Sequence, residues 1–307
     1  MTMFRFLMAK QNSSAGYIIF AGGYLSSGAA TNISDKYILP TDAVSVGPSL
    51  STARESHAAG GNRSISILAC GKTGSTIITS SEKLNFQSES FSSASTLSNA
   101  RHILSCSSGQ GFALFAGGTT SITPNIVTDS TEKYNLSTDV RSSGGNLTSQ
   151  MSNMSGSGNE QLGLFAGQQT AAGGATNKVD KYAYSSDTSS AGTTLSVAKF
   201  GCGAYSNKSM SIIAGGWLAP NATEVVEKYN LQTDSRTLGT SLGTKRSSPG
   251  SGGNEIACIF AFGYNNTTFV NTSEKYIFSS DSRTNATTLT GSGRNSLTGS
   301  SSQPGHL

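Results

Sequence analysis

The chain has 307 residues, enough for one large or two average domains, and 21 Lys and Arg against 17 Asp and Glu give it a net charge of +4. Charged residues make up only 12 % and there are 36 glycines, a composition that excludes a disordered chain and is typical of short strands joined by tight turns. The basic residues are dispersed and no apolar run is long enough to span a bilayer, so we expect neither nucleic-acid binding nor membrane insertion.

Residues 1–13 are expected to form an N-terminal extension ahead of the first predicted strand. The stretch from Met1 to Lys10 has only the short apolar fragment Phe6-Leu7-Met8, and it lacks the apolar core of about 7–15 residues that a signal peptide requires. No signal peptide is therefore expected.

An internal repeat of about 48 residues runs from residue 14 onward. An apolar run that ends in two small residues recurs six times, and its last positions, 47 to 50 residues apart, are Gly23, Gly71, Gly118, Gln168, Gly216 and Gly263. An acidic-Lys-Tyr triplet keeps step with it, with Leu84 in place of Tyr in the second copy, and its acidic members are Asp35, Glu82, Glu132, Asp180, Glu227 and Glu274. Two markers in step over six copies establish the repeat.

The elements of each copy follow in one order, and they predict four strands. A strand of small residues, such as 57–61, precedes the apolar run, and the triplet lies in a third strand. A Thr-Asp or Ser-Asp turn, as at Thr41-Asp42, leads to the fourth. That strand ends near a Leu that is followed four residues later by a basic residue, at Leu50/Arg54, Leu97/Arg101, Leu195/Lys199 and Leu242/Arg246, whereas Met151 follows Leu147.

This order resembles the kelch repeat over nearly the whole chain. The resemblance implies an all-β, six-bladed β-propeller of four-stranded blades over residues 14–303, followed by a tail at 304–307. The chain departs from the kelch pattern in lacking a Trp after the turn, because its single tryptophan, Trp217, lies elsewhere. Its Ser/Thr/Gly-rich style is similar to kelch-like proteins encoded among the structural genes of tailed bacteriophages, which implies a virion protein; an extracellular or cytoplasmic location is the alternative.

The spacing of the markers predicts how the ring closes. From the basic position to the end of the small-residue pair there are 17 residues in copies two to six, as from Arg54 to Gly71, but only 13 from Lys10 to Gly23. The first copy is thus too short to supply its own first strand. We expect residues 296–301 to supply it and to close the ring.

Features present in every copy are assigned to the fold rather than to catalysis. This applies to the acidic triplets and to Arg54, Arg101, Lys199 and Arg246, whose alternative role is a weakly basic rim. His57 and His102 occupy different offsets, and each is expected to be satisfied or exposed. The four cysteines, Cys70, Cys106, Cys202 and Cys258, are expected to be small buried residues in different repeats. We therefore predict no enzyme, no cofactor and no metal site, with an enzyme that uses the central channel as the minor alternative.

Function is expected where the copies differ, in the loops at one end of the blades. The residues after the small-residue pair are aromatic in copies one, five and six, at Tyr24, Trp217 and Tyr264, and these blades are consecutive in a closed ring. Aromatic faces stack on sugars and dominate binding hot spots. We predict a ligand-binding site there, for a host-surface glycan or another virion structural protein; packing against their own neighbours is the alternative for these residues. The loop from Thr119 to Asp129 is a second candidate contact, and a general protein-interaction scaffold is the alternative function.

Overall fold

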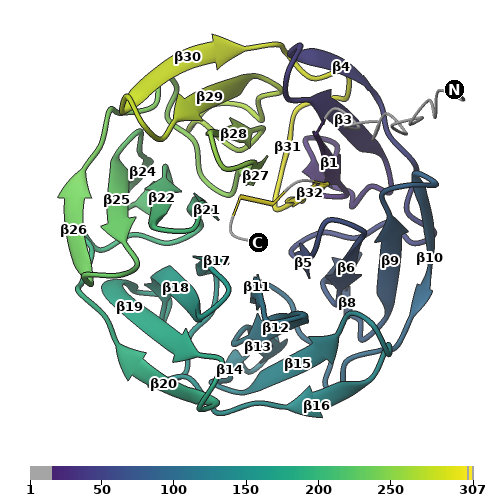
Figure 1. Cartoon of the computed structure of the whole chain (residues 1–307). Coiled ribbons are helices and arrows are strands. Elements are labelled where there is room, and N and C mark those ends of the chain that lie inside the picture. The colour runs from purple at the N-terminus through teal and green to yellow at the C-terminus, as the bar shows by residue number, and fades with distance from the viewer. Residues whose placement is uncertain (1–15, 303, 306–307) are drawn as a thin grey trace, which may run out of the picture.

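The computed structural model describes residues 16–302 and 304–305 as a ring of six four-stranded antiparallel sheets around a central axis (Figure 1). The predicted all-β, six-bladed propeller is confirmed. The expected extension at 1–13 and the last two residues of the expected tail, 306–307, lie outside the described residues.

Each blade runs from an inner strand at the axis to an outer strand at the rim. From the inner strand outward, blade one consists of β32 (Thr298–Ser301), β1 (Tyr17–Ala21), β3 (Ser34–Ile38) and β4 (Ala43–Val46), and blade two of β5 (Ala58–Gly61), β6 (Ile65–Ala69), β9 (Ser81–Asn85) and β10 (Ser90–Ala94). In the same order, blade three consists of β11 (Ser105–Gly109), β12 (Phe112–Ala116), β15 (Thr131–Asn135) and β16 (Arg141–Ser143), and blade four of β17 (Ser155–Gly158), β18 (Leu162–Gln169), β19 (Ala175–Ala183) and β20 (Thr188–Ala191). Blade five consists of β21 (Gly203–Ser206), β22 (Met210–Ala214), β25 (Val226–Asn230) and β26 (Ser235–Leu238), and blade six of β27 (Gly250–Gly253), β28 (Ala257–Ala261), β29 (Ser273–Ile277) and β30 (Ser282–Ala286).

Blade one joins the two ends of the described chain. Strand β32 pairs antiparallel with β1, in a register that places Ile18 opposite Ser301 and Ala21 opposite Thr298. The C-terminal strand therefore supplies the inner strand of the first blade, as the spacing predicted. Closure pairs an edge that would otherwise remain open.

Short hairpins project from one end of the propeller, which we call the hairpin face. Strand pairs of two or three residues form them in blades two, three and five: β7 (Lys72–Thr73) with β8 (Thr76–Ile77), β13 (Thr119–Ser121) with β14 (Ile126–Val127), and β23 (Trp217–Leu218) with β24 (Asn221–Ala222). In blade one, β2 (Tyr24–Leu25) pairs with β31 (Arg294–Asn295). Gly23, Gly71, Gly118 and Gly216 precede these segments, and Gly263 holds the same position in blade six; their φ angles lie between 94° and 111°, a conformation that favours glycine.

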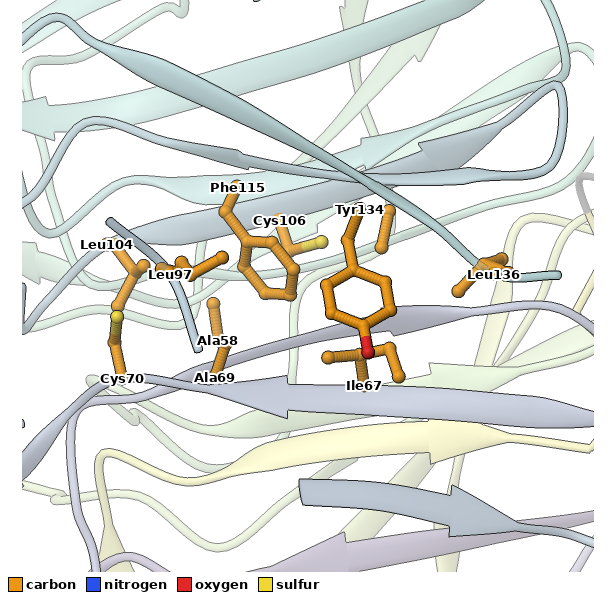
Figure 2. Close-up of a cluster of buried hydrophobic side chains, with 11 residues drawn as sticks. Ala58, Ile67, Ala69, Cys70, Leu97, Leu104, Cys106, Phe115, Tyr134 and Leu136 are labelled. Carbon is orange, nitrogen blue, oxygen red and sulfur yellow. The ribbon is translucent and has the colours of Figure 1, made fainter. Parts of the chain in front are cut away.

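The hydrophobic core consists of six clusters, one at each interface between neighbouring blades. Figure 2 shows the cluster between blades two and three, where Phe115 and Tyr134 face Ile67 and Ala69. The second and third strands supply the large side chains, because both of their faces are covered by adjacent blades. Burial of these faces holds the blades together and leaves the loops at the two ends free to vary.

The inner strands carry small residues because they are crowded around the axis. A Cβ atom on Gly60 would collide with the Cys106 side chain, and one on Gly299 would collide with the Ser251 main chain of blade six. Larger side chains at these positions would hold the inner strands apart. The Gly, Ser and Ala composition of these strands is therefore a requirement of closure.

A buried ion pair fixes the entry to most blades, and it explains why two of the sequence markers recur together. The basic residue of each pair is fully buried and contacts the acidic residue of the triplet in the same blade. The guanidinium of Arg246, for example, donates to Glu274 at 2.8 Å and to the carbonyl oxygens of Phe262 and Thr272. The equivalent pairs are Arg54–Glu82, Arg101–Glu132, Lys199–Glu227 and Arg294–Asp35. A weakly basic rim, the alternative considered for these residues, is wrong because they are inaccessible.

Blade four departs from this arrangement through two linked substitutions. Met151 takes the basic position and packs in the apolar cluster between blades three and four. Gln168 takes the glycine position, and its amide lies 3.5 Å from the Asp180 carboxylate, which Thr148 also contacts. Desolvation raises the pKa of Asp180, because these neutral donors replace a cation only in part.

A second set of ion pairs runs around the ring and joins each blade to the next. The Lys of each triplet contacts the acidic residue in the turn of the following blade, and the pairs are Lys36–Glu89, Lys83–Asp139, Lys133–Asp187, Lys181–Asp234, Lys228–Asp281 and Lys275–Asp42. In every copy except the second, the triplet Tyr also donates to the turn Asp of its own blade. Although desolvation opposes it, hydrogen bonds from Lys228 and Tyr276 lower the pKa of Asp281 to about 2.

Candidate functional site

At the centre of the hairpin face, the main chains of six residues form a closed ring of hydrogen bonds, which we call the peptide ring. Each blade contributes one residue whose N–H donates to the carbonyl oxygen of the residue in the neighbouring blade, at 2.6–3.0 Å. All six residues have φ between 47° and 60°, and they are Ser56, Ile103, Asn153, Gly201, Ser248 and Ser296. The ring ties the inner ends of all the blades together across this face.

Six bridged residue pairs surround the peptide ring, one in each blade. Each pair joins the residue after the basic position to the residue after the small-residue pair, and the pairs are Tyr24–Asn295, Glu55–Lys72, His102–Thr119, Ser152–Gln169, Phe200–Trp217 and Ser247–Tyr264. The main-chain geometry repeats, but the side chains do not. Blades five, six and one carry aromatic residues here, whereas blades two, three and four carry charged and polar ones.

The aromatic residues at these positions, Tyr24, Trp217 and Tyr264, are here called the aromatic arc. All three are partly buried. Phe269 joins two of them, because its ring lies edge-on to Tyr264 at 5.5 Å and to Tyr24 at 6.3 Å between centroids. Tyr264 is fixed further by its hydroxyl, which donates to the Asn266 carbonyl oxygen at 2.8 Å.

Trp217 lies in the adjacent blade and is connected to this cluster through the loops. Its N–H and carbonyl group exchange hydrogen bonds with Phe200, which places a second aromatic residue in the same bridged pair. The N–H of Ala222, in the same hairpin as Trp217, donates to the Asn266 side chain of blade six at 2.6 Å. The arc therefore spans three blades that are in direct contact at their loops, as the predicted order around the ring requires.

Amide side chains lie beside the arc in the loops of blades six and one. The loop between Tyr264 and Phe269 contains Asn265, whose side chain accepts main-chain N–H groups within the loop. Asn295 pairs with Tyr24, and the adjacent Arg294 is fully buried against Asp35. Such a surface can stack on and hydrogen-bond to an uncharged ligand.

The opposite half of the hairpin face is polar. Lys72 and Glu55 form an ion pair at 3.2 Å. His102 follows in the next blade, where burial, with a smaller contribution from Lys72, lowers its pKa to about 4. Its Nε2 atom has no hydrogen-bond partner within the described residues, so the expectation of a satisfied or exposed His102 is wrong.

His57 lies closer to the axis, at the interface of blades two and one. Its Nε2 lies 3.1 Å from Thr298 Oγ1, whereas its Nδ1 has no partner among the residues described. Burial, together with nearby Arg54, lowers the pKa of His57 to about 3, so the ring is neutral at pH 7. His57 is thus only half satisfied, and it does not meet His102 in a common site.

The described residues contain no cluster of three or more side chains suited to a metal ion. All four cysteines are free and buried, as predicted, and burial raises their pKa values. Thiolate chemistry at neutral pH is unfavourable for such groups.

The second candidate contact, the loop after Thr119, forms the β13–β14 hairpin. Ile122 and Ile126 at its tip are 47 % and 50 % exposed, and the Asn125 side chain donates to Ala171 of the blade-four hairpin at 2.8 Å. This places an apolar tip on the side of the hairpin face away from the aromatic arc.

Sequence reasoning identified the arc but missed Phe200, Phe269 and the peptide ring. Phe200 carried a usable signal, since it directly follows the basic position Lys199. Phe269 carried none, because it lies in a loop with no repeated offset. The peptide ring depends on main-chain geometry at six positions with unlike side chains.

Comparison with known proteins supports the fold alone. No protein-family model and no curated protein matches the chain. Among solved structures, the one titled "Structure of YjhT" is similar with a TM-score of 0.66 and 11 % sequence identity, over 80 % of this chain and 86 % of that chain. The described part of this chain contains no helix long and apolar enough to cross a membrane.

Proposed function

We propose that this chain is a non-enzymatic binding module, displayed on a virion, that contacts a host-surface glycan through the aromatic arc. The observation that carries the proposal is the asymmetry of the hairpin face. One main-chain arrangement repeats six times, yet aromatic side chains occupy it only in three consecutive blades. The kelch-like repeat and its similarity to proteins encoded among tailed-phage structural genes support the virion setting.

The chemistry of the arc favours a sugar ligand. Aromatic rings offer apolar faces to the C–H faces of a pyranose, and amides and hydroxyls at their edges satisfy its hydroxyl groups. Tyr264 and Tyr24 are held in place by Phe269, so little side-chain entropy is lost on binding. Five of the six recurring carboxylates are engaged in buried ion pairs, which supports a binding role without acid–base catalysis.

An unbiased glycan array probed with the purified protein tests the proposal. We expect selective binding to a small set of glycans, and loss of that binding in the double variant Trp217→Ala/Tyr264→Ala. The matched control is Lys72→Ala/Gln169→Ala, which changes the same repeated position in blades two and four, on the polar half of the hairpin face. Binding that is absent from the array, or equal for both double variants, would remove the proposal. Immunogold labelling of purified particles tests the virion setting separately.

A protein-interaction scaffold is the second candidate, and the exposed isoleucines of the β13–β14 hairpin favour it. An apolar tip of this kind suits a pocket on a partner structural protein. Cross-linking of intact particles should then join this hairpin to a neighbour, and Ile122→Ser/Ile126→Ser should abolish the cross-link without affecting glycan binding.

A further inference from the structure

A cavity of about 190 Å³ lies on the propeller axis beneath the peptide ring. The inner strands of all six blades line it, and the peptide ring covers one end. Pro304 reaches the lining from the C-terminal segment, and the next residue, Gly305, donates its N–H to the Tyr205 hydroxyl at 2.7 Å. Figure 1 shows that β32, which ends at Ser301, lies on the side of blade one that faces the axis.

Hydroxyl groups dominate the polar part of this lining. Every blade contributes at least one serine, as represented by Ser301, Ser66, Ser108, Ser157, Ser206 and Ser251. Several of these hydroxyls also join neighbouring blades; Ser108 and Ser301, for example, each accept a main-chain N–H at 2.8–2.9 Å. A hydroxyl has one donor and two acceptor positions, so a group with one such bond keeps capacity for a ligand.

Within the described residues, no Asp, Glu, Lys or Arg side chain lines the cavity. His57 does line it, is only 4 % exposed, and has an Nδ1 atom without a partner. The cavity volume is below the range of about 300–1,000 Å³ that is typical of sites for drug-sized ligands. A charged molecule would lose its hydration there without gaining a counter-ion.

We propose that the axial cavity is a second binding site, for a small uncharged polyol. Such a molecule is small enough for the cavity and supplies several hydroxyls to the serine lining. This site is separate from the aromatic arc, because the peptide ring lies between them.

Erythritol is a suitable probe, with glycerate as the charged control. We expect saturation-transfer NMR at millimolar concentration to detect erythritol but not glycerate, and a crystal soaked in erythritol to show it beside His57. Two independent variants should each weaken binding at least tenfold: Ser251→Leu, which fills the cavity, and His57→Phe, which replaces a polar lining side chain with an apolar one. Thermal unfolding establishes that each variant is folded.

The variant Trp217→Ala/Tyr264→Ala separates this site from the arc, because it should bind erythritol as the unmodified protein does. A soaked crystal with only water on the axis, or equal erythritol binding by the unmodified protein and both cavity variants, would overturn the proposal. Loss of erythritol binding in the arc variant would place the polyol at the arc instead.

Discussion

Arg246 illustrates why the recurring charged residues act in folding. It is fully buried, and its guanidinium satisfies two carbonyl groups and a carboxylate that also accepts the main-chain N–H groups of Gly243 and Thr244. One side chain thus connects the blade entry to the second and third strands. A surface basic residue would make no such set of contacts.

Removing the carboxylate from this pair should be costly. Glu274→Gln leaves the Arg246 cation buried without a counter-charge, and a broken buried pair typically costs about 3–5 kcal/mol. Asp180→Asn is the matched control, because its blade carries Met151 in place of the cation. Calorimetry should show a large fall in Tm for the first variant and a much smaller change for the second. Equal effects would contradict the assigned role of the ion pair.

The raised pKa of Asp180 also predicts a pH dependence. Its ionisation is less favourable in the folded protein than in the unfolded chain, where the pKa is about 3.9, so the penalty is absent below that pH. The loss of folding free energy caused by this ionisation grows as the pH rises toward the pKa of the folded protein, and above that pKa it stays constant. The Tm of Asp180→Asn relative to the unmodified protein should therefore rise with pH over this interval. A flat or falling difference would show that Asp180 is not destabilised by ionisation.

At the scale of elements, the inner strands depend on the absence of side chains. A Cβ on Gly299 of β32 would overlap the Ser251 main chain, whereas a Cβ on Gly174 in the blade-four hairpin would make only an ordinary contact with Thr170. We expect Gly299→Ala to destabilise the protein by about 1–3 kcal/mol, since main chain must shift. Gly174→Ala should be neutral or slightly stabilising. Denaturant unfolding compares the two, and a similar midpoint for both would refute the crowding argument.

The strands and the ring closure were predictable because each produces a repeated sequence signal. Recurring apolar runs, turn dipeptides and the 17-residue spacing all reflect local requirements that recur from blade to blade. The hairpins were harder to predict from the sequence, since strands of two residues carry almost no periodicity. The contact of Phe269 with Tyr24 joins blade six to blade one, and no spacing within a single copy encodes it.

The candidate site was predictable only in part, because only some of its residues occupy a repeated position in the sequence. Tyr24, Trp217 and Tyr264 occupy one repeated position, so comparison of the copies found them. The cavity on the axis and the half-satisfied state of His57 arise from the meeting of six blades. Both features form only when the ring closes, so no single copy of the repeat predicts them.

At the scale of the whole molecule, closure depends on the C-terminal segment. Residues 289–307 include Leu289 in the core between blades six and one, Arg294 in a buried ion pair, and all of β32. Deletion of this segment would expose the edge of β1 and remove the peptide-ring residue Ser296. The truncated protein should unfold or aggregate. An unchanged thermal midpoint would contradict closure by this segment.

We propose that this repeated scaffold carries its function where the copies differ. The six positions after the small-residue pair share one main-chain environment, which makes them a matched set: Tyr24, Lys72, Thr119, Gln169, Trp217 and Tyr264.

The decisive measurement is the affinity of the single alanine variants at these six positions for the glycan selected on the array. We predict that Tyr24→Ala, Trp217→Ala and Tyr264→Ala each weaken binding at least tenfold, and that the three variants in blades two, three and four bind as the unmodified protein does. A uniform effect around the ring, or a loss confined to blades two to four, would contradict the account.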